Sequence, residues 1–325
     1  MVQPCFKLDA LQARAKTYKK IRHFFDDRGV LEVETPLMTP YTVTDPHVHS
    51  LGVPYEENNW YLQTSPEYMM KQLIALYQKD IYQICKAFRD DQFGHHHQPE
   101  FTMLEWYRMG FDYQALMQEV IMLVRDLIGD VPVVYVSYAA LFEDVLGINP
   151  LNATCDELAE LAGMLVPFDV AALEFTLSDW QQLLFSFVVE PTLKNKPCVM
   201  VYDFPISHSS LARPCKHDPR LSARFEMFLN GVECANGFEE LVSVDDCARR
   251  FKVDLAQRQR QGLQLVDMDK PFLDAMHHGI PACAGVSIGI DRILMYILDA
   301  KSIEQVIPRK FNFTDALKAK SSMAV

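Results

Sequence analysis

The sequence predicts an α+β domain in which a mainly antiparallel sheet is flanked by helices and interrupted by a helical insertion. Three observations predict this class. An amphipathic helical pattern opens the chain, apolar residues alternate with period two in residues 101–107 and 225–229, and Asn230–Gly231 is a hairpin-turn signal between two strands. The 325 residues, 49% of them hydrophobic, suffice for a sizeable core.

Composition excludes several classes of protein. The eight cysteines are scattered without a CxxC pair, which favours reduced thiols in a cytoplasmic protein over a zinc or disulfide framework. No apolar run is long enough for a membrane span, and the N-terminus lacks the sections of a signal peptide. The net charge of −12 argues against stable binding of nucleic acid through a broad basic surface.

The spacing of apolar residues from about 9 to 28 predicts an amphipathic helix. Gly29 is expected to end it as the C′ residue. Its expected apolar stripe is Leu11, Ala15, Tyr18, Ile21 and Phe25. Its other faces carry the basic residues Arg14, Lys16, Lys19, Lys20 and Arg22. This basic cluster is either an ordinary solvated face or a docking site for an acidic partner.

A short strand stopped by Pro36, a loop to Pro46 and a strand at residues 60–63 follow. Thr64 and Glu67 then have the spacing of a capping box, with Pro66 near the first helical turn. Glu67 therefore either caps a helix or presents its carboxylate to a ligand.

The segment from Phe88 to Tyr107 is a strand, a histidine-rich loop and a second strand. Alternation places Phe101, Met103, Glu105 and Tyr107 on one face, and Leu104 and Trp106 on the other. Together with Arg89, that face offers a cation, an aromatic ring, a carboxylate and a phenol. These groups are suited to binding a nucleotide and an amine. The alternative is a half-buried hairpin with a solvated loop. The consecutive histidines 95–97 fit phosphate contact, acceptor contact or solvation better than a metal site.

Residues 112–128 and 153–190 predict helices without evident chemistry. No repeat, low-complexity segment or linker divides the chain. We therefore expect one domain, residues 1–325, with a helical insertion at about 112–195.

A second region rich in candidate functional residues surrounds the hairpin turn at Asn230–Gly231. Glu226 faces away from the apolar side of its strand, and the next strand places Asn236, Phe238 and Glu240 on one face. Glu233 has the other parity, so it joins them only through a bulge, for which Gly237 is the candidate. Two carboxylates held together need a cation, and Mg²⁺ on phosphates is the expected one. The alternative is an exposed acidic hairpin.

The last region rich in candidate functional residues runs from residue 279 to 298, where a strand containing glycines leads into a helix. Gly285 and Gly289 allow close backbone approach to a ligand, and Arg292 lies in the first helical turn.

Together these segments resemble the catalytic domain of class II aminoacyl-tRNA synthetases, specifically that of lysyl-tRNA synthetase. The helix–Gly29–strand–Pro36 segment resembles the first motif, which forms the dimer interface in the family, so a homodimer is implied. F-R-D-D with H-Q-P-E-F-T-M-L-E-W-Y resembles the second motif, and G-I-D-R the third. T-S-P-E-Y and E-C-A-N-G-F-E-E-L are lysine-type features, and the resemblance spans about residues 10 to 307.

Only a helix precedes the first motif, without the anticodon-binding OB-fold of lysyl-tRNA synthetases. This is similar to their truncated paralogues, which use ATP and Mg²⁺ to activate (R)-β-lysine and transfer it to a lysine of elongation factor P. Two alternatives remain. One is a truncated enzyme that charges tRNA or a small molecule with lysine. The other is a silent regulatory paralogue, against which the intact set Arg89, Glu226, Glu233 and Arg292 speaks.

The resemblance implies roles for individual residues. Arg89 would hold the α-phosphate, and Phe101 and Arg292 would sandwich the adenine. Glu226 and Glu233 would bind Mg²⁺. Glu240 and Tyr107 would receive one ammonium group and Glu67, at the opposite end of the pocket, the other, while Asn236 would bind the carboxylate. Further ATP contacts are expected from Asp90, Asp91, Gln98, Cys234 and Gly289, and further substrate contacts from Ser65, Pro66, Phe238 and Ser287.

Two positions depart from the family pattern. Asp91 stands where the family has Glu, which shortens its reach by one methylene. Ser287 stands where lysyl-tRNA synthetases have Gly. We expect the Ser287 side chain to narrow the pocket and to disfavour α-lysine relative to its β-isomer.

Overall fold

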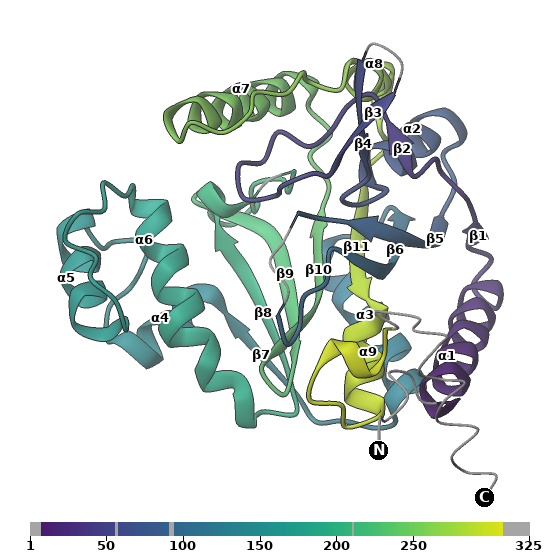
Figure 1. Ribbon diagram of the computed structural model, residues 1–325, viewed down its shortest axis with the longest axis horizontal. Coiled ribbons are helices and arrows are strands. Elements are labelled where there is room, and N and C mark those ends of the chain that lie inside the picture. Colours follow the sequence, from purple (N-terminus) through teal and green to yellow (C-terminus); the bar gives the residue numbers. More distant parts are fainter. Residues whose placement is uncertain (1–7, 56–57, 91–93, 210, 308–325) are drawn as a thin grey trace, which may run out of the picture.

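A computed structural model describes residues 8–55, 58–90, 94–209 and 211–307 of the chain. Its centre is an eight-stranded sheet in the order β1-β5-β6-β11-β10-β9-β8-β7 (Figure 1). Only the edge pairs β1–β5 and β7–β8 are parallel, so the prediction of a mainly antiparallel sheet is confirmed. The strands are β1 (Leu31–Glu32), β5 (Ile81–Phe88), β6 (Glu100–Met109), β7 (Val133–Ser137), β8 (Cys198–Pro205), β9 (Leu221–Leu229), β10 (Val232–Glu239) and β11 (Cys283–Gly289).

One face of the sheet is covered by three helices, α1 (Leu8–Asp26), α3 (Tyr113–Ile128) and α9 (Ile290–Ile297). Helix α3 contacts β9, β10 and β11, and α1 contacts α3 and α9. The largest hydrophobic core lies between these helices and the sheet, and it contains Leu104, Trp106, Phe225 and Met227. The alternation expected in β6 and β9 is therefore confirmed on this face.

The apolar stripe expected on α1 is wrong in part. Leu11 is 50% exposed and Ala15 is also exposed. The buried residues are Ala10, Thr17, Ile21, Phe24 and Phe25. The stripe is rotated because Arg14, counted as polar, lies at a position that faces inward, where it pairs with the buried carboxylate of Asp291.

The turn after α1 is as expected at Gly29, which has a positive φ of 65°. The helix itself ends at Asp26, and the N–H of Val30 donates to the carbonyl of Phe25, which closes the turn.

At one end of the sheet, α2 (Glu67–Tyr77), α7 (Val244–Arg260) and α8 (Lys270–Gly279) pack around a second core that includes Met70, Phe251 and Phe272. A small sheet adjoins them in Figure 1, in the order β2-β4-β3. Its strands are β2 (Met38–Thr39), β3 (Gly52–Tyr55) and β4 (Asn58–Leu62).

A separate helical lobe covers the other end, with its own core of residues such as Tyr138, Phe142 and Trp180 packed against β8 (Figure 1). It comprises α4 (Tyr138–Leu146), α5 (Cys155–Leu165), α6 (Leu177–Leu184), the π-helix η1 (Phe185–Val189) and the 3-10 helix η2 (Glu190–Asn195). The expected insertion began near residue 112, but α3 belongs to the main layer and β7 joins the main sheet. A five-residue edge strand between two helices was too short to be recognised.

Two short 3-10 helices, η3 (Ile206–His208) and η4 (Ile303–Gln305), complete the described elements. Within the described ranges, no helix has both the length and the apolar character to cross a membrane. The seven cysteines in those ranges are all free thiols.

Candidate active site

Three adjoining cavities form a cleft over the sheet face opposite α3, and Glu233 and Asn236 line all three. The arginine cavity (about 170 Å³) contains Arg89, Phe101 and Arg292. The carboxylate cavity (about 310 Å³) contains Glu67, Glu105, Tyr107 and Glu240. The outer cavity (about 380 Å³) lies against the helical lobe and contains Asp179, Glu190 and His208.

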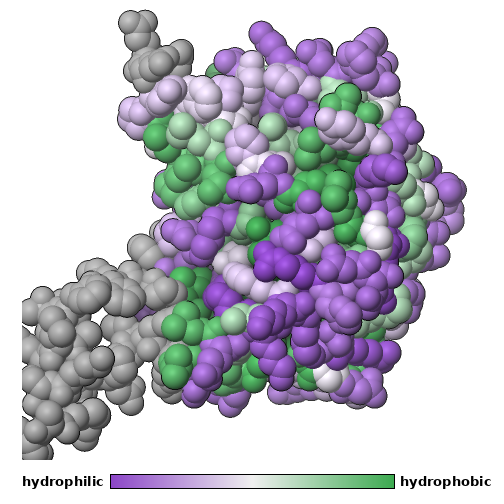
Figure 2. All heavy atoms as spheres, turned by 90° about the vertical axis from the view of Figure 1, so that its right-hand side faces the viewer, coloured by the Kyte–Doolittle hydropathy of each residue, from purple (hydrophilic) through white to green (hydrophobic). Residues whose placement is uncertain are grey.

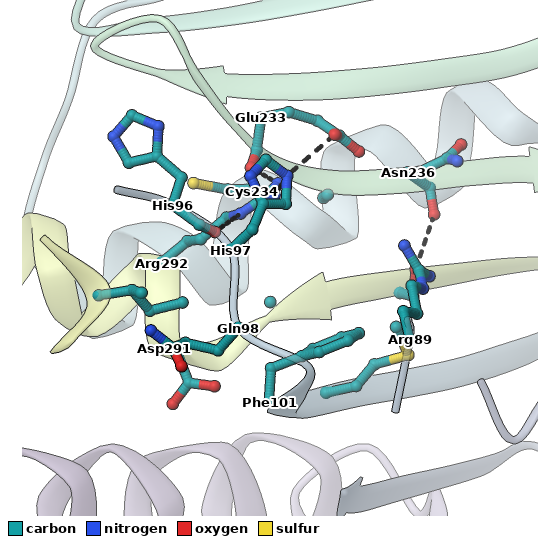
Figure 3. A pocket seen from close by; sticks show the side chains of 15 residues that line it. Arg89, His96, His97, Gln98, Phe101, Glu233, Cys234, Asn236, Asp291 and Arg292 are labelled. Atoms are coloured by element: carbon teal, nitrogen blue, oxygen red, sulfur yellow. Dashed lines mark hydrogen bonds and ion pairs between the residues drawn. The ribbon is translucent and has the colours of Figure 1, made fainter. Parts of the chain in front are cut away.

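The arginine cavity is held between β6, α9 and the histidine-rich loop (Figure 3). The guanidinium of Arg89 lies 5.3 Å from the ring centre of Phe101 and points toward Asn236. Arg292, in the first turn of α9, donates to the carbonyl of Glu233 at 2.6 Å and contacts Nε2 of His97 at 2.9 Å. Two arginines and an aromatic ring thus surround a space suited to a planar, anionic ligand.

Of the other residues predicted to contact ATP, some line this cavity and others do not. Gln98, Cys234 and Gly289 line it. The Nε2 of Gln98 is buried without an acceptor among the described residues, so it has a hydrogen bond to give to a ligand. Asp90 is exposed and does not line the cavity, and Asp91 lies outside the described residues.

Behind two carboxylates of this cavity lies Lys71, a buried residue that the sequence analysis missed. The Nζ of Lys71 lies 2.5 Å from Oε1 of Glu67 and 2.5 Å from Oε2 of Glu240, and its side chain is only 2% exposed. Burial alone would lower the pKa of Lys71, but the two carboxylates raise it above its usual value. Glu67 and Glu240 are therefore neighbours joined by one ammonium group, and the expectation that they occupy opposite ends of the pocket is wrong.

Glu105 is the third carboxylate of this cavity. It accepts hydrogen bonds from Ser65 at 3.0 Å and from the phenol of Tyr107 at 2.6 Å. Tyr107 was expected to act with Glu240 instead. Burial, reinforced by Glu67, raises the pKa of Glu105 to about 7, and burial raises the pKa of Glu240 to about 8 although Lys71 opposes the shift.

The predicted capping box is absent. Helix α2 begins at Glu67, with Pro66 at the N-cap and without a side-chain cap. The hydroxyl of Ser65 accepts from the N–H of Glu67 at 3.0 Å and takes over the capping that Thr64 was expected to give. The Glu67 side chain therefore turns into the cavity toward Lys71.

Gly285 has a different role from the one expected. A Cβ at this position would collide with the ring of Tyr107 and approach Oε1 of Glu240 to 2.7 Å. The glycine thus makes room for two side chains of the carboxylate cavity rather than for a ligand. At Gly289 the nearest atom, Cδ of Arg292, would be 3.6 Å away, an ordinary contact.

The expected bulge exists, but at Cys234 rather than Gly237. Glu233 pairs with Phe228 and Ala235 pairs with Met227, so Cys234 is the extra residue. The bulge turns Glu233 to the face that carries Glu226. Gly237 is needed for packing, because a Cβ there would approach Phe225 and Val286 to within 2.7 Å.

Three carboxylates line the outer cavity beside the hairpin: Glu226, Glu233 and Glu190. Burial raises the pKa of Glu226 to about 8, with Arg224, 2.5 Å away, opposing the shift and the other two carboxylates reinforcing it. Burial and Glu233 raise the pKa of Glu190 to about 7. The three do not form a compact set of ligands by themselves, so a hard divalent cation held by Glu226 and Glu233 would also need phosphate oxygens of a ligand.

The remaining predicted residues connect the cavities. Asn236 accepts from Nε of Arg224 at 3.1 Å. Ser287, paired with Asn236 across β10 and β11, lines both the arginine and the carboxylate cavities. Phe238 lines the carboxylate and outer cavities, and Pro66 lines none of them. In the outer cavity, burial lowers the pKa of His208 to about 4, so its imidazole is neutral at pH 7.

Sequence reasoning missed Lys71, Glu190 and Arg224. Two of them had a signal. Lys71 follows Glu67 at the i,i+4 spacing of helical ion pairs, and Arg224 shares the strand face of Glu226. Glu190 belongs to a segment that appeared to lack chemistry, and only the packing of the helical lobe brings it to the cleft.

Comparison with known proteins identifies the class to which this cleft belongs. The family model described as "tRNA synthetases class II (D, K and N)" matches residues 7–310. The chain therefore belongs to the class II aminoacyl-tRNA synthetase family, as its sequence and fold predict.

Within this class, three similar curated proteins carry the name "Elongation factor P--(R)-beta-lysine ligase". The protein from Pseudoalteromonas translucida (strain TAC 125) is 43% identical over 94% of this chain and 96% of its own length. Those from Pasteurella multocida (strain Pm70) and Salmonella typhimurium (strain LT2) are 40% and 41% identical, with the same coverage.

Proposed function

We propose that this chain uses ATP to activate (R)-β-lysine as an aminoacyl-adenylate and transfers the β-lysyl group to a lysine side chain of elongation factor P. The relatives described above are named as ligases of elongation factor P and (R)-β-lysine. The observation that carries the proposal is a cavity rich in carboxylates, among them Glu67, Glu105 and Glu240, that adjoins at Asn236 a cavity lined by two arginines and a phenylalanine.

The charge of the carboxylate cavity suits a diamino acid. At one end of it, the cluster of Glu67, Glu105, Glu240 and the adjoining Lys71 has a net charge of two negative units when all four groups are ionised. β-Lysine carries two ammonium groups, and burying either without a partner would cost several kcal/mol. Its carboxylate would then lie toward Asn236 and Arg89, at the junction with the arginine cavity.

The arginine cavity would hold ATP. Phe101 and Arg292 would enclose the adenine, Gln98 would donate its unused hydrogen bond, and Arg89 would face the α-phosphate. Mg²⁺ bound by Glu226 and Glu233, with Glu190 nearby, would neutralise charge on the phosphates.

Activation needs no general base, because the substrate carboxylate is already a nucleophile. It attacks the α-phosphorus, pyrophosphate leaves, and Arg89 stabilises the charge that builds on the phosphoryl oxygens. The rate then comes from positioning by rigid strands.

The outer cavity would admit the acceptor lysine. Its walls include Asp45, Asp179, Glu190 and Asp254, so they attract a cationic side chain. Elongation factor P as acceptor agrees with this feature and with the names of the relatives.

A homodimer agrees with the surface of α1 and β1, where Leu8, Leu11 and Leu31 are 66%, 50% and 57% exposed. Figure 2 faces this side and shows apolar patches among hydrophilic ones. The molecular mass in solution tests this part of the proposal, since the mass of a single chain would contradict it.

Incubation of the enzyme with ATP, Mg²⁺ and (R)-β-lysine, together with either elongation factor P or total tRNA, tests the acceptor. We expect a β-lysyl mass increase on elongation factor P, abolished by replacing its acceptor lysine, and no aminoacylated tRNA. Charging of tRNA without modification of the protein would support the alternative, a truncated synthetase.

A further inference from the structure

A group of potential metal ligands lies outside the cleft, where β8 and the loop before β9 meet the start of α3. Asp203 belongs to β8, and Cys215 and His217 belong to the loop. None of the three lines the cavities of the cleft. Cys215 and Tyr113, the first residue of α3, are part of the main hydrophobic core on the opposite side of the sheet.

The Asp203 carboxylate is the centre of the group. Its Oδ2 lies 3.2 Å from Nε2 of His217. Its Oδ1 accepts hydrogen bonds from the phenol of Tyr113 at 2.7 Å and from the thiol of Cys215 at 3.5 Å. The ligand atoms of Asp203, Cys215 and His217 all lie within 4.8 Å of one another, and no other such set of three occurs among the described residues.

The backbone holds two of these side chains firmly. Asp203 has a φ of +59°, rare for a residue other than glycine, at a shift of register between β8 and β9. Cys215 is buried, and its N–H donates to the carbonyl of Leu221 at 2.8 Å. His217 has a side chain 58% exposed, so it can adjust to a ligand. Strain retained at a polar cluster often marks a functional site.

We propose that Asp203, Cys215 and His217 form a binding site for a transition-metal ion of the zinc type. One sulfur, one nitrogen and one oxygen ligand are the donors that Zn²⁺ prefers, and the exposed side of His217 leaves a fourth position for water. Mg²⁺ prefers oxygen ligands alone, so this site differs in kind from the three carboxylates of the cleft.

The surrounding contacts support such a site. The hydrogen bond from Tyr113 orients the Asp203 carboxylate, as second-shell groups commonly do for metal ligands. A bound ion would fasten the loop after η3 to β8. That loop leads directly into β9, which carries Arg224 and Glu226, so the ion would stabilise the fold beside the cleft without entering it.

Titration of the full-length, metal-free protein with Co²⁺ tests the proposal, because cobalt bound to a thiolate gives a charge-transfer absorption band. We expect this band in the wild type at one equivalent, and its disappearance when Zn²⁺ is added. It should be absent in Cys215→Ser and retained in Cys155→Ser, a matched variant at an exposed free cysteine. The histidines at 95–97 can also bind cobalt, and Cys234 lines the same cavity, so the loss of the band in Cys215→Ser is the result that assigns it to the proposed site.

His217→Ala separates loss of metal binding from misfolding, because this side chain is exposed and its removal should leave the fold intact. We expect its cobalt affinity to fall at least roughly tenfold. Zn²⁺ should raise the melting temperature of the wild type but not of His217→Ala. A wild type without the band, a band that persists in Cys215→Ser, or an equal thermal shift in wild type and His217→Ala would overturn the proposal.

Discussion

Single residues set the charge of the cleft, and Lys71 is the most consequential of them. Its ammonium group keeps Glu67 and Glu240 side by side in a buried space where two carboxylates would otherwise repel each other. Glu105 has no such direct partner, and its pKa is raised to about 7. Its ionisation therefore changes between pH 6 and 8, as does that of Glu190 in the outer cavity.

The raised pKa of Glu105 predicts a pH dependence of substrate binding. Below about pH 7 the carboxyl is protonated and cannot pair with an ammonium group, so (R)-β-lysine should bind more tightly as the pH rises. We expect the KM for (R)-β-lysine in ATP–pyrophosphate exchange to fall roughly tenfold from pH 6 to pH 8. The KM of Glu105→Gln should be high at both pH values and should change much less between them. The small change that remains would come from the titration of Glu240. An identical pH profile in both proteins would contradict this role.

Ser287 is expected to determine the choice of lysine isomer. Its hydroxyl lies 3.5 Å from the carbonyl of Asn236, where the arginine and carboxylate cavities meet. Ser287→Gly removes this side chain, and we expect the ratio of kcat/KM for α-lysine over β-lysine to rise roughly tenfold. Ser287→Ala, which keeps the Cβ, should change the ratio much less. If Ser287→Gly leaves the preference unchanged, the side chain does not select the isomer.

At the scale of elements, strand register decides which side chains meet. Period-two alternation predicted the faces of β6 and β9 correctly, and Asn230–Gly231 forms the expected turn, with both residues at positive φ. The need for a bulge near Glu233 was also predictable, because parity alone excluded Glu233 from the cleft. Its position at Cys234 was not predictable, since it depends on how Phe225 and Val286 pack over Gly237.

The antiparallel pairing of β11 with β6 predicts unequal effects of two glycine substitutions. Gly285→Ala would force Tyr107 and Glu240 apart, so we expect a loss of about 1–3 kcal/mol in the free energy of unfolding and loss of pyrophosphate exchange. Gly289→Ala meets only ordinary contacts and should change stability by less than about 0.5 kcal/mol. Urea unfolding measures both. Equal stabilities of the two variants would show that the carboxylate cavity is not tightly packed against β11.

We propose the basic cluster of α1 as a docking surface for elongation factor P, although Arg14 of that cluster is engaged with Asp291. Lys16 and Lys19 are exposed. Their double reversal to Glu should slow transfer to elongation factor P several-fold at low salt and leave adenylate formation unchanged. The control is Lys252→Glu with Lys270→Glu, an equal change of charge on α7 and α8. Equal slowing by both pairs would assign the effect to net charge rather than to α1.

At the scale of the whole molecule, the cleft lies on the sheet face opposite α3, between the helices α2, α7 and α8 at one end and the helical lobe at the other. Sequence motifs identified the strands and most of the residues around the nucleotide and substrate cavities. The outer cavity could not be predicted, because Glu190 and His208 reach it only through the packing of the helical lobe on β8. Lys71 was missed for a related reason, since its i,i+4 spacing predicts an ion pair with Glu67 but not burial beside Glu240, which lies 169 positions further along the chain.

ATP–pyrophosphate exchange driven by (R)-β-lysine tests most directly whether the carboxylate cavity holds two ammonium groups while the arginine cavity holds ATP. We expect exchange with (R)-β-lysine, weaker exchange with α-lysine, and at least roughly a hundredfold loss with a β-amino acid of equal length that lacks the terminal amine. Exchange that proceeds equally well without the terminal amine, or no exchange with either lysine isomer, would contradict the account.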